Sequence, residues 1–194
     1  MSSTNRSRVR DEHIADYYVT PVETIQEFLQ AFNEVESVFQ NEDIVILDPC
    51  AGGDIKNPMS YPEALAREGI DSRNILTLDI REDSLAEIKG DFLTLDQGEF
   101  DVIISNPPFK LALEFIERSL QQTAEDGFVI MLLRLNFFET KTRKPFFERH
   151  MPKYAFVHHK RMSFTEDGKT DSVAYMHCVW QKGNYPDHTE LRII

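Results

Sequence analysis

The sequence predicts an α/β fold in which helices cover a mostly parallel β-sheet. Short apolar runs alternate along the chain with segments of helical periodicity, which is typical of strands joined by crossover helices. The apolar runs are continuous rather than alternating, as expected for strands that are buried on both faces. The length of 194 residues and the hydrophobic fraction of 41% suit one packed domain.

The first half of the chain is expected to hold a tail, two helices and two strands. Residues 1–16 are polar and are assigned to a flexible N-terminal tail, which leaves residues 17–194 for the domain. A helix should begin at Pro21, because apolar residues follow it at helical spacing and proline suits the first helical turn. The other expected elements are a strand at 44–47, a helix at 60–68, a strand at 75–78 and a helical turn at 84–88.

The second half continues this alternation and ends in a hairpin. The expected strands are at 101–105, 128–133, 154–158 and 172–180, and the expected helices are at 111–120 and 137–149. A glycine-containing turn at 166–170 separates the last two strands. Because so short a connection makes two strands antiparallel, we expect an antiparallel strand at the end of the sheet.

The charge of the chain is unevenly distributed. A net charge of −12 is unusual for a protein that binds nucleic acid, because phosphate contacts use Lys and Arg. Residues 134–161, however, carry eight basic and two acidic side chains. Lys141, Arg143 and Lys144 lie in this segment and are candidate phosphate contacts. The solvated face of an amphipathic helix would carry similar charges, so that alternative stays open.

Several classes of protein are disfavoured by features that the sequence lacks. No apolar run approaches the roughly 20 residues that span a bilayer, so no membrane association is expected. The polar N-terminus lacks the apolar core of a signal peptide, and the low cysteine content suits a reducing compartment, so we expect a cytoplasmic protein. Cys50 and Cys178 have no metal-ligand spacing, so no metal site is expected.

The Asn-Pro-Pro-Phe tetrapeptide at 106–109 follows a predicted strand and can activate an amine. An aromatic amine is a poor nucleophile, and acceptors on its N–H groups stabilise the positive charge that develops during methyl transfer. The side-chain oxygen of Asn106 and the backbone carbonyl of Pro107 can be these acceptors. Pro108 would stiffen the turn, and Phe109 offers a stacking face for a base. The alternative is a proline-rich turn that merely ends a strand.

Two aspartates and a glycine-rich loop follow the preceding strands. The 48–54 segment begins Asp48-Pro49 and includes Gly52, and glycines let a loop approach a ligand closely. Asp79 ends the next strand, where a carboxylate can accept hydrogen bonds from both hydroxyls of a ribose. Since the carboxyl ends of parallel strands meet at one edge of a sheet, these residues and Asn106 should share a site. An ordinary glycine-rich turn and a strand-ending aspartate are the respective alternatives.

Taken in order, these motifs resemble those of S-adenosylmethionine (SAM)-dependent amino-methyltransferases, over residues 16–181. Residues 106–109 are similar to the family's catalytic motif (D/N/S)PP(Y/F/W). The 48–54 loop resembles the DPxxGxG cofactor loop, although Asp54 stands in place of its last glycine. The segments 18–21 and 90–92 resemble two further SAM motifs. The resemblance implies a Rossmann-like methyltransferase fold with a mostly parallel seven-stranded sheet and an antiparallel terminal strand.

The resemblance also implies a role for each matching residue. Phe164, beside the expected hairpin turn, is similar to the family's second wall of the target pocket, opposite Phe109. Lys169 in that turn would meet phosphate. The residues implied for binding SAM are Tyr18, Thr20, Pro21, Asp48, Pro49, Gly52, Asp79, Asp91, Phe92 and Asn106.

The expected activity is methylation of the N6 amine of adenine in nucleic acid, with DNA as the favoured polymer, as in small phage-type adenine methyltransferases. Proteins that methylate glutamine share the Asn-first motif, and the acidic charge favours that alternative. RNA adenine methylation and a non-catalytic SAM-fold partner also stay open. Because little of the chain lies outside the expected domain, target recognition is assigned to the tail, the 134–153 segment, the hairpin or a second subunit.

Overall fold

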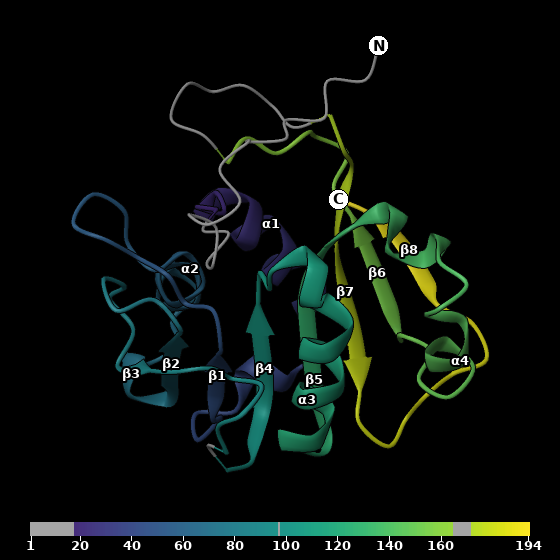
Figure 1. Cartoon of the computed structure of the whole chain (residues 1–194), viewed down its shortest axis with the longest axis horizontal. Helices are drawn as coiled ribbons and strands as arrows, with labels where there is room; N and C mark the ends of the chain where they lie inside the picture. Colours follow the sequence, from purple (N-terminus) through teal and green to yellow (C-terminus); the bar gives the residue numbers. More distant parts are fainter. Residues whose placement is uncertain (1–17, 97, 165–171) are drawn as a thin grey trace.

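The computed structural model describes residues 18–96, 98–164 and 172–194, which form a sheet with helices on both faces (Figure 1). Eight strands are present in these residues, in the spatial order β3-β2-β1-β4-β5-β7-β6-β8. Strand β7 is antiparallel to both of its neighbours, and the other neighbouring pairs are parallel. The strands are β1 Ile46–Asp48, β2 Ile75–Asp79, β3 Ile88–Lys89, β4 Phe100–Ser105, β5 Thr123–Arg134, β6 Tyr154–Val157, β7 Tyr175–Gln181 and β8 Glu190–Ile193.

This arrangement confirms the predicted α/β fold with a mostly parallel sheet and one antiparallel strand. Two details differ from the expectation. The described residues form eight strands rather than seven, because β8 pairs with β6 at the edge of the sheet. The antiparallel strand β7 lies between β5 and β6 instead of at the end. Strand β7 is buried along most of its length, as suits the interior of the sheet, whereas the edge strand β8 is largely exposed and has no long apolar run.

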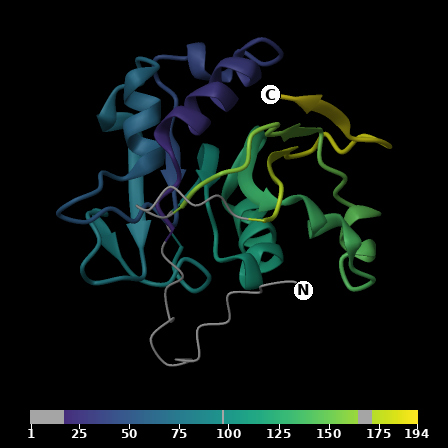
Figure 2. The same ribbon diagram turned by 90° about the horizontal axis from the view of Figure 1, so that it is seen from above.

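The helices form two layers around the sheet (Figure 2). Helices α1 (Val22–Asn33) and α2 (Ser60–Arg67) pack on each other over one face. Helix α3 (Ala112–Gln122) and the short α4 (Lys144–Phe147) cover the other face. The 3₁₀ turns are η1 Val38–Gln40, η2 Ser72–Asn74, η3 Phe109–Leu111 and η4 Leu135–Glu139. No helix in the described residues is long and apolar enough to cross a membrane.

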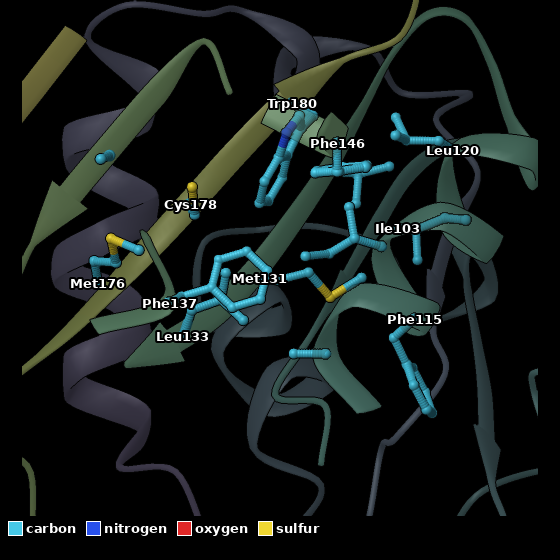
Figure 3. Packing of buried hydrophobic residues seen from close by; sticks show 14 of the residues in the cluster. Ile103, Phe115, Leu120, Met131, Leu133, Phe137, Phe146, Met176, Cys178 and Trp180 are labelled. Atoms are coloured by element: carbon cyan, nitrogen blue, oxygen red, sulfur yellow. The ribbon is translucent and has the colours of Figure 1, made fainter. Parts of the chain in front are cut away.

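Each face of the sheet has its own hydrophobic core. Under α1, the rings of Phe28, Phe32 and Phe156 pack edge-to-face and stacked, with centroids 5.2–6.1 Å apart. On the opposite face, Met131 and Trp180 pack with residues from α3, η4 and α4 (Figure 3). The indole of Trp180 donates a hydrogen bond to the carbonyl of His150, 2.9 Å away, so its one polar atom is satisfied.

The segment at 84–88 does not form the expected helical turn. Lys89 folds back so that its Nζ donates to the carbonyls of Ser84 and Ala86, 2.5 and 2.9 Å away. These bonds hold an irregular loop, which leads into β3 at the edge of the sheet. A lysine that closes a loop through backbone carbonyls leaves no periodic signal in the sequence, so the loop could not be recognised.

The expected helix at 137–149 is interrupted. It is replaced by η4, an irregular segment and the short α4. Pro145 lies near the start of α4, where proline is tolerated, but it could not lie within a continuous helix because it lacks an N–H donor. Arg143 fixes the break, because its guanidinium donates to the carbonyl of Phe137, 2.8 Å away.

The order of the strands creates a crevice at one edge of the sheet. From β1 the chain runs outward to β2 and β3 and then returns to form β4 on the other side of β1. Crossovers therefore leave in opposite directions on the two sides of β1, and such a switch point is where parallel α/β sheets bind ligands. The carboxyl ends of β1, β2 and β4 lie at this edge.

We predict that Phe32→Ala lowers the free energy of unfolding by about 3–5 kcal/mol, because it opens a cavity in the α1 core. The Phe32 ring is fully buried and contacts Phe28, Phe128 and Phe156. Phe138→Ala is the matched control, because that ring is 39% exposed, and it should cost less than about 1 kcal/mol. Urea unfolding of the three proteins measures both effects, and equal losses would show that the α1 core is placed wrongly.

Candidate functional site

A pocket opens at the carboxyl ends of β1, β2 and β4, at the switch point. The space among its lining residues is about 870 Å³, a volume that includes open solvent. The walls come from the loops after these strands, from the segment before α1 and from the start of α2 and α3. The lining residues are Tyr18, Thr20, Pro49, Cys50, Ala51, Ser60, Tyr61, Asp79, Ile80, Arg81, Gly90, Asp91, Phe92, Leu93, Asn106, Pro108, Leu111 and Phe115.

The loop after β1 is compact because two glycines allow it to turn sharply. Gly52 and Gly53 have φ angles of 64° and 76°, in the left-handed region that side chains disfavour. A side chain at Gly53 would also come within 2.8 Å of Met59. The resulting turn presents Pro49, Cys50 and Ala51 to the pocket, so Gly52 shapes the wall without lining it.

Asp48 lies directly behind this wall and is fully buried. Its Oδ1 accepts hydrogen bonds from the Ser105 hydroxyl, 2.6 Å away, and from the Cys50 amide, 3.2 Å away. Its Oδ2 is buried and has no hydrogen-bond partner. Burial, with a smaller contribution from the negative charge of Asp79, raises the pKa of this carboxyl to about 7, although the hydrogen bonds from Ser105 and Cys50 act in the opposite direction. Asp48 therefore joins the ends of β1 and β4, and it does not line the pocket.

Asp79 ends β2 and lines the pocket with 6% of its surface exposed. Its two oxygens accept hydrogen bonds from the amides of Gly52 and Arg81, both 2.8 Å away. These bonds fix the carboxylate against the β1 loop. Each oxygen keeps a second lone pair, so the carboxylate can still accept hydrogen bonds from a ligand.

Asp91 and Phe92 form the wall next to β3. Asp91 Oδ1 accepts from the Leu93 amide at 3.0 Å, which leaves further lone pairs for a ligand. The Phe92 ring is 1% exposed and packs on Phe115, with centroids 5.4 Å apart. Phe92 is thus both a core residue and part of the pocket wall.

The side chain of Asn106 is oriented by Thr20, a residue 86 positions earlier in the chain that lies just before α1. Its Nδ2 donates to the Thr20 hydroxyl, 3.1 Å away, and Thr20 is 2% exposed. Pro21, not Thr20, occupies the N-cap position of α1, so the Thr20 hydroxyl is not used in capping. The Asn106 Oδ1 is buried without a hydrogen-bond partner, and both residues line the pocket. A buried acceptor left unsatisfied in this way is available to a donor on a ligand.

An aromatic cluster, defined here as Tyr18, Phe109, Phe164 and Tyr175, lies beside the turn at 106–109. The Phe109 centroid is 6.3 Å from that of Tyr18 and 5.6 Å from that of Tyr175. Phe164 lies 5.8 Å from Tyr18 and 5.0 Å from Tyr175. The guanidinium carbon of Arg134 lies 4.5 Å from the centre of the Phe109 ring. The fold thus brings Phe109 and Phe164 into one group, as a shared target pocket requires.

The remaining predicted residues are distributed outside the pocket. Pro21 is the N-cap residue of α1, and Pro107 is buried in the turn after β4. Lys141 and Lys144 are exposed, and Lys144 forms an ion pair with Glu148 at 3.4 Å. Arg143 packs over the Phe137 ring at 4.2 Å and donates to its carbonyl, so its guanidinium supports the fold. Lys169 lies outside the described residues.

Sequence reasoning missed several residues of the site, and Tyr61 is the clearest example. Tyr61 lines the pocket, and its hydroxyl is 3.0 Å from Nε2 of His177 on β7. Nδ1 of His177 is in turn 2.8 Å from Nε2 of His158. Burial lowers the pKa of His158 to about 4 and that of His177 well below its usual range, so this polar chain is neutral. Only the three-dimensional structure brings these residues together.

Comparison with known proteins identifies the fold. No protein-family profile and no curated protein sequence matches the chain. A candidate RNA methyltransferase from Pyrococcus horikoshii has a similar structure, with a TM-score of 0.64 and 15% identity over 86% of this chain and 88% of that one. A candidate class I SAM-dependent methyltransferase from Listeria monocytogenes gives a TM-score of 0.61 and 16% identity over 91% of this chain.

The M protein of the type I restriction enzyme EcoKI is also similar, with a TM-score of 0.59 and 15% identity over 87% of this chain. The matched region spans 65% of the Listeria protein and 44% of the EcoKI protein. These likenesses show that the described residues have the class I SAM-dependent methyltransferase fold. The predicted Rossmann-like methyltransferase architecture is thereby confirmed.

We predict that Asp48→Asn stabilises the protein, and more so at high pH. The pKa of the Asp48 carboxyl is 3.8 in the unfolded chain and about 7 in the folded protein. Its contribution to stability is fully present at pH values below 3.8 and is lost as the pH rises through about 7. Asparagine keeps an acceptor for Ser105 and carries no charge. Its stabilising effect should therefore be about 2 kcal/mol larger at pH 8.5 than at pH 5.5.

Urea unfolding at the two pH values measures this difference. Asp187→Asn is the matched control, because Asp187 is exposed, and it should change the stability by less than about 0.5 kcal/mol at either pH. A gain from Asp48→Asn that does not depend on pH would show that the carboxyl is not held in an unfavourable environment.

Proposed function

We propose that this protein transfers the methyl group of SAM to the N6 amine of adenine in nucleic acid, with DNA as the preferred polymer. The observation that carries the proposal is the buried Asn106 Oδ1, which lines the pocket and has no partner. An acceptor that is held in place and unsatisfied can bind an amine hydrogen. The similarity to the EcoKI M protein, an adenine N6 methyltransferase, supports the same assignment.

The residues of the pocket fit SAM as a ligand. SAM carries a cationic sulfonium and a cationic ammonium, and it supplies a methyl group activated for transfer to a nucleophile. Asp79 and Asp91 place two carboxylates in the pocket wall, and their remaining lone pairs suit hydroxyl and amino donors. Asp48 adds negative charge from behind the wall. The glycine turn lets the backbone of Pro49–Ala51 approach the ligand closely.

The catalytic step depends on how Asn106 holds the target amine. Its Oδ1 would accept one N–H of the amine, and the Pro107 carbonyl would accept the other. When bound, SAM would supply a methyl group activated by its sulfonium, and acceptance of that methyl group would place positive charge on the amine nitrogen held by these two oxygens. The two oxygens stabilise this charge more in the transition state than in the ground state. The extra proton then leaves to solvent, and the direct transfer needs no covalent intermediate.

The aromatic cluster would hold the target base. Phe109 follows the catalytic turn directly, and Phe164 and Tyr175 lie within reach of the same space. A base in a duplex must leave the stack to reach this site, which costs a few kcal/mol. Stacking on aromatic rings offsets part of that cost.

A protein-glutamine methyltransferase is the second candidate. The amide of glutamine also presents two N–H groups that Asn106 and Pro107 could accept. The net charge of −12 favours a target without phosphate groups, such as a protein, over a nucleic acid, which carries many phosphate groups. The aromatic cluster favours a flat base over a short amide. RNA is the alternative polymer, and the similarity to a candidate RNA methyltransferase supports it.

We predict that Asn106→Ala lowers the rate of methyl transfer to DNA by about 10²–10³-fold, because the charge-stabilising acceptor is lost. Binding of SAM, measured by calorimetry, should change little. Asn184→Ala is the matched control, because Asn184 donates to Gln181 in a turn outside the pocket, and it should keep full activity. Near-normal turnover by Asn106→Ala would contradict the proposed mechanism.

A further inference from the structure

Arg134 is a cation at the edge of the target site. It is the last residue of β5, and it lies opposite Tyr175 in the register of β5 with β7. Its guanidinium carbon lies 4.5 Å from the centre of the Phe109 ring, which is cation–π distance. Both Phe109 and Tyr175 belong to the aromatic cluster. The charge of Arg134 is therefore fixed beside the space proposed for the target base.

This charge is not neutralised within the described part of the chain. The Nε atom of Arg134 is buried without a hydrogen-bond partner, and no ion pair of the side chain is found among the described residues. By contrast, Arg67 pairs with Glu63, Arg73 with Asp71 and Arg192 with Glu190. A partly buried guanidinium without a carboxylate is unfavourable unless a ligand supplies the negative charge.

The geometry leaves the guanidinium suited to one kind of anion. The Phe109 ring lies on one side of the guanidinium, and a ligand can bind through the N–H donors at the rim of the group. Two parallel N–H groups at that edge match two oxygens of a phosphate. A glutamine side chain is neutral and would leave the positive charge uncompensated.

We propose that Arg134 binds a backbone phosphate of the target nucleotide while its face supports Phe109. This assignment rests on the proposed function, because it places the target base beside Phe109. It defines the substrate as a polynucleotide rather than a protein. The net charge of the chain is negative, but the proposed contact involves only one phosphate and the positive charge of Arg134 beside it. A nucleic-acid substrate is therefore compatible with the acidic composition.

The test is binding of a fluorescent adenine-containing duplex oligonucleotide, measured by anisotropy between 50 and about 300 mM KCl. Arg134→Gln should weaken binding about tenfold or more and reduce the salt dependence by about one counterion. Arg134→Lys keeps the charge and loses the paired donors, so it should weaken binding while keeping the salt dependence. Arg73→Gln removes the same charge near the start of β2, at the opposite edge of the sheet, and should bind like the wild type.

Urea unfolding and SAM calorimetry on each variant separate this contact from a loss of structure. If Arg134→Gln fails to fold, the lysine variant carries the test, and a reduced salt dependence in that variant would overturn the proposal. Unchanged binding by Arg134→Gln, or no oligonucleotide binding by the wild type, would also overturn it. Arg134-dependent binding without N6-methyladenine as product would leave the phosphate contact standing and refute the proposed function alone.

Discussion

Two buried carboxylates hold together the loops that follow β1, β2 and β4, and the pocket depends on them. Asp48 accepts a hydrogen bond from Ser105, so the end of β1 is tied to the residue that precedes Asn106. Asp79 accepts from the amide of Gly52, which ties β2 to the same loop. Burial raises the pKa of Asp48 to about 7, so its ionised form is unfavourable in the folded protein. Under the proposed function, the ionised carboxylate would attract the cationic SAM.

Much of the fold could be predicted from the chain because most of its strands, including β1, β2, β4, β6 and β7, are apolar and buried. The ends of the strands also located part of the site, since Asp79 and Asn106 follow apolar runs and both line the pocket. The resemblance added Asp91 and Phe92, which lie in the same wall. These residues share one pocket because the carboxyl ends of parallel strands meet at one edge, whatever the details of packing.

The remaining features depend on contacts between distant segments, which leave no local pattern. Strand β8 is exposed and short, and β7 lies inside the sheet because it pairs with both β5 and β6, which are separated from it in the sequence by other segments. Asp48 was expected in the pocket but lies behind its wall, because the glycine turn brings backbone in front of it. Arg143 was expected to contact phosphate, yet its guanidinium donates a hydrogen bond to the backbone carbonyl of Phe137. Arg134 became a candidate phosphate-binding residue only when the structure showed its guanidinium beside Phe109, without an ion pair to any described residue.

The identity of the methylated product tests the central claim most directly. The purified protein would be incubated with methyl-labelled SAM and, separately, with unmethylated duplex DNA, single-stranded DNA, RNA and a cell-protein extract. Mass spectrometry then identifies the labelled group, and parallel reactions with Asn106→Ala exclude a contaminating enzyme. The account predicts N6-methyladenine in nucleic acid, formed by the wild type and lost in the variant. Label found only on the amide nitrogen of glutamine in protein would contradict it.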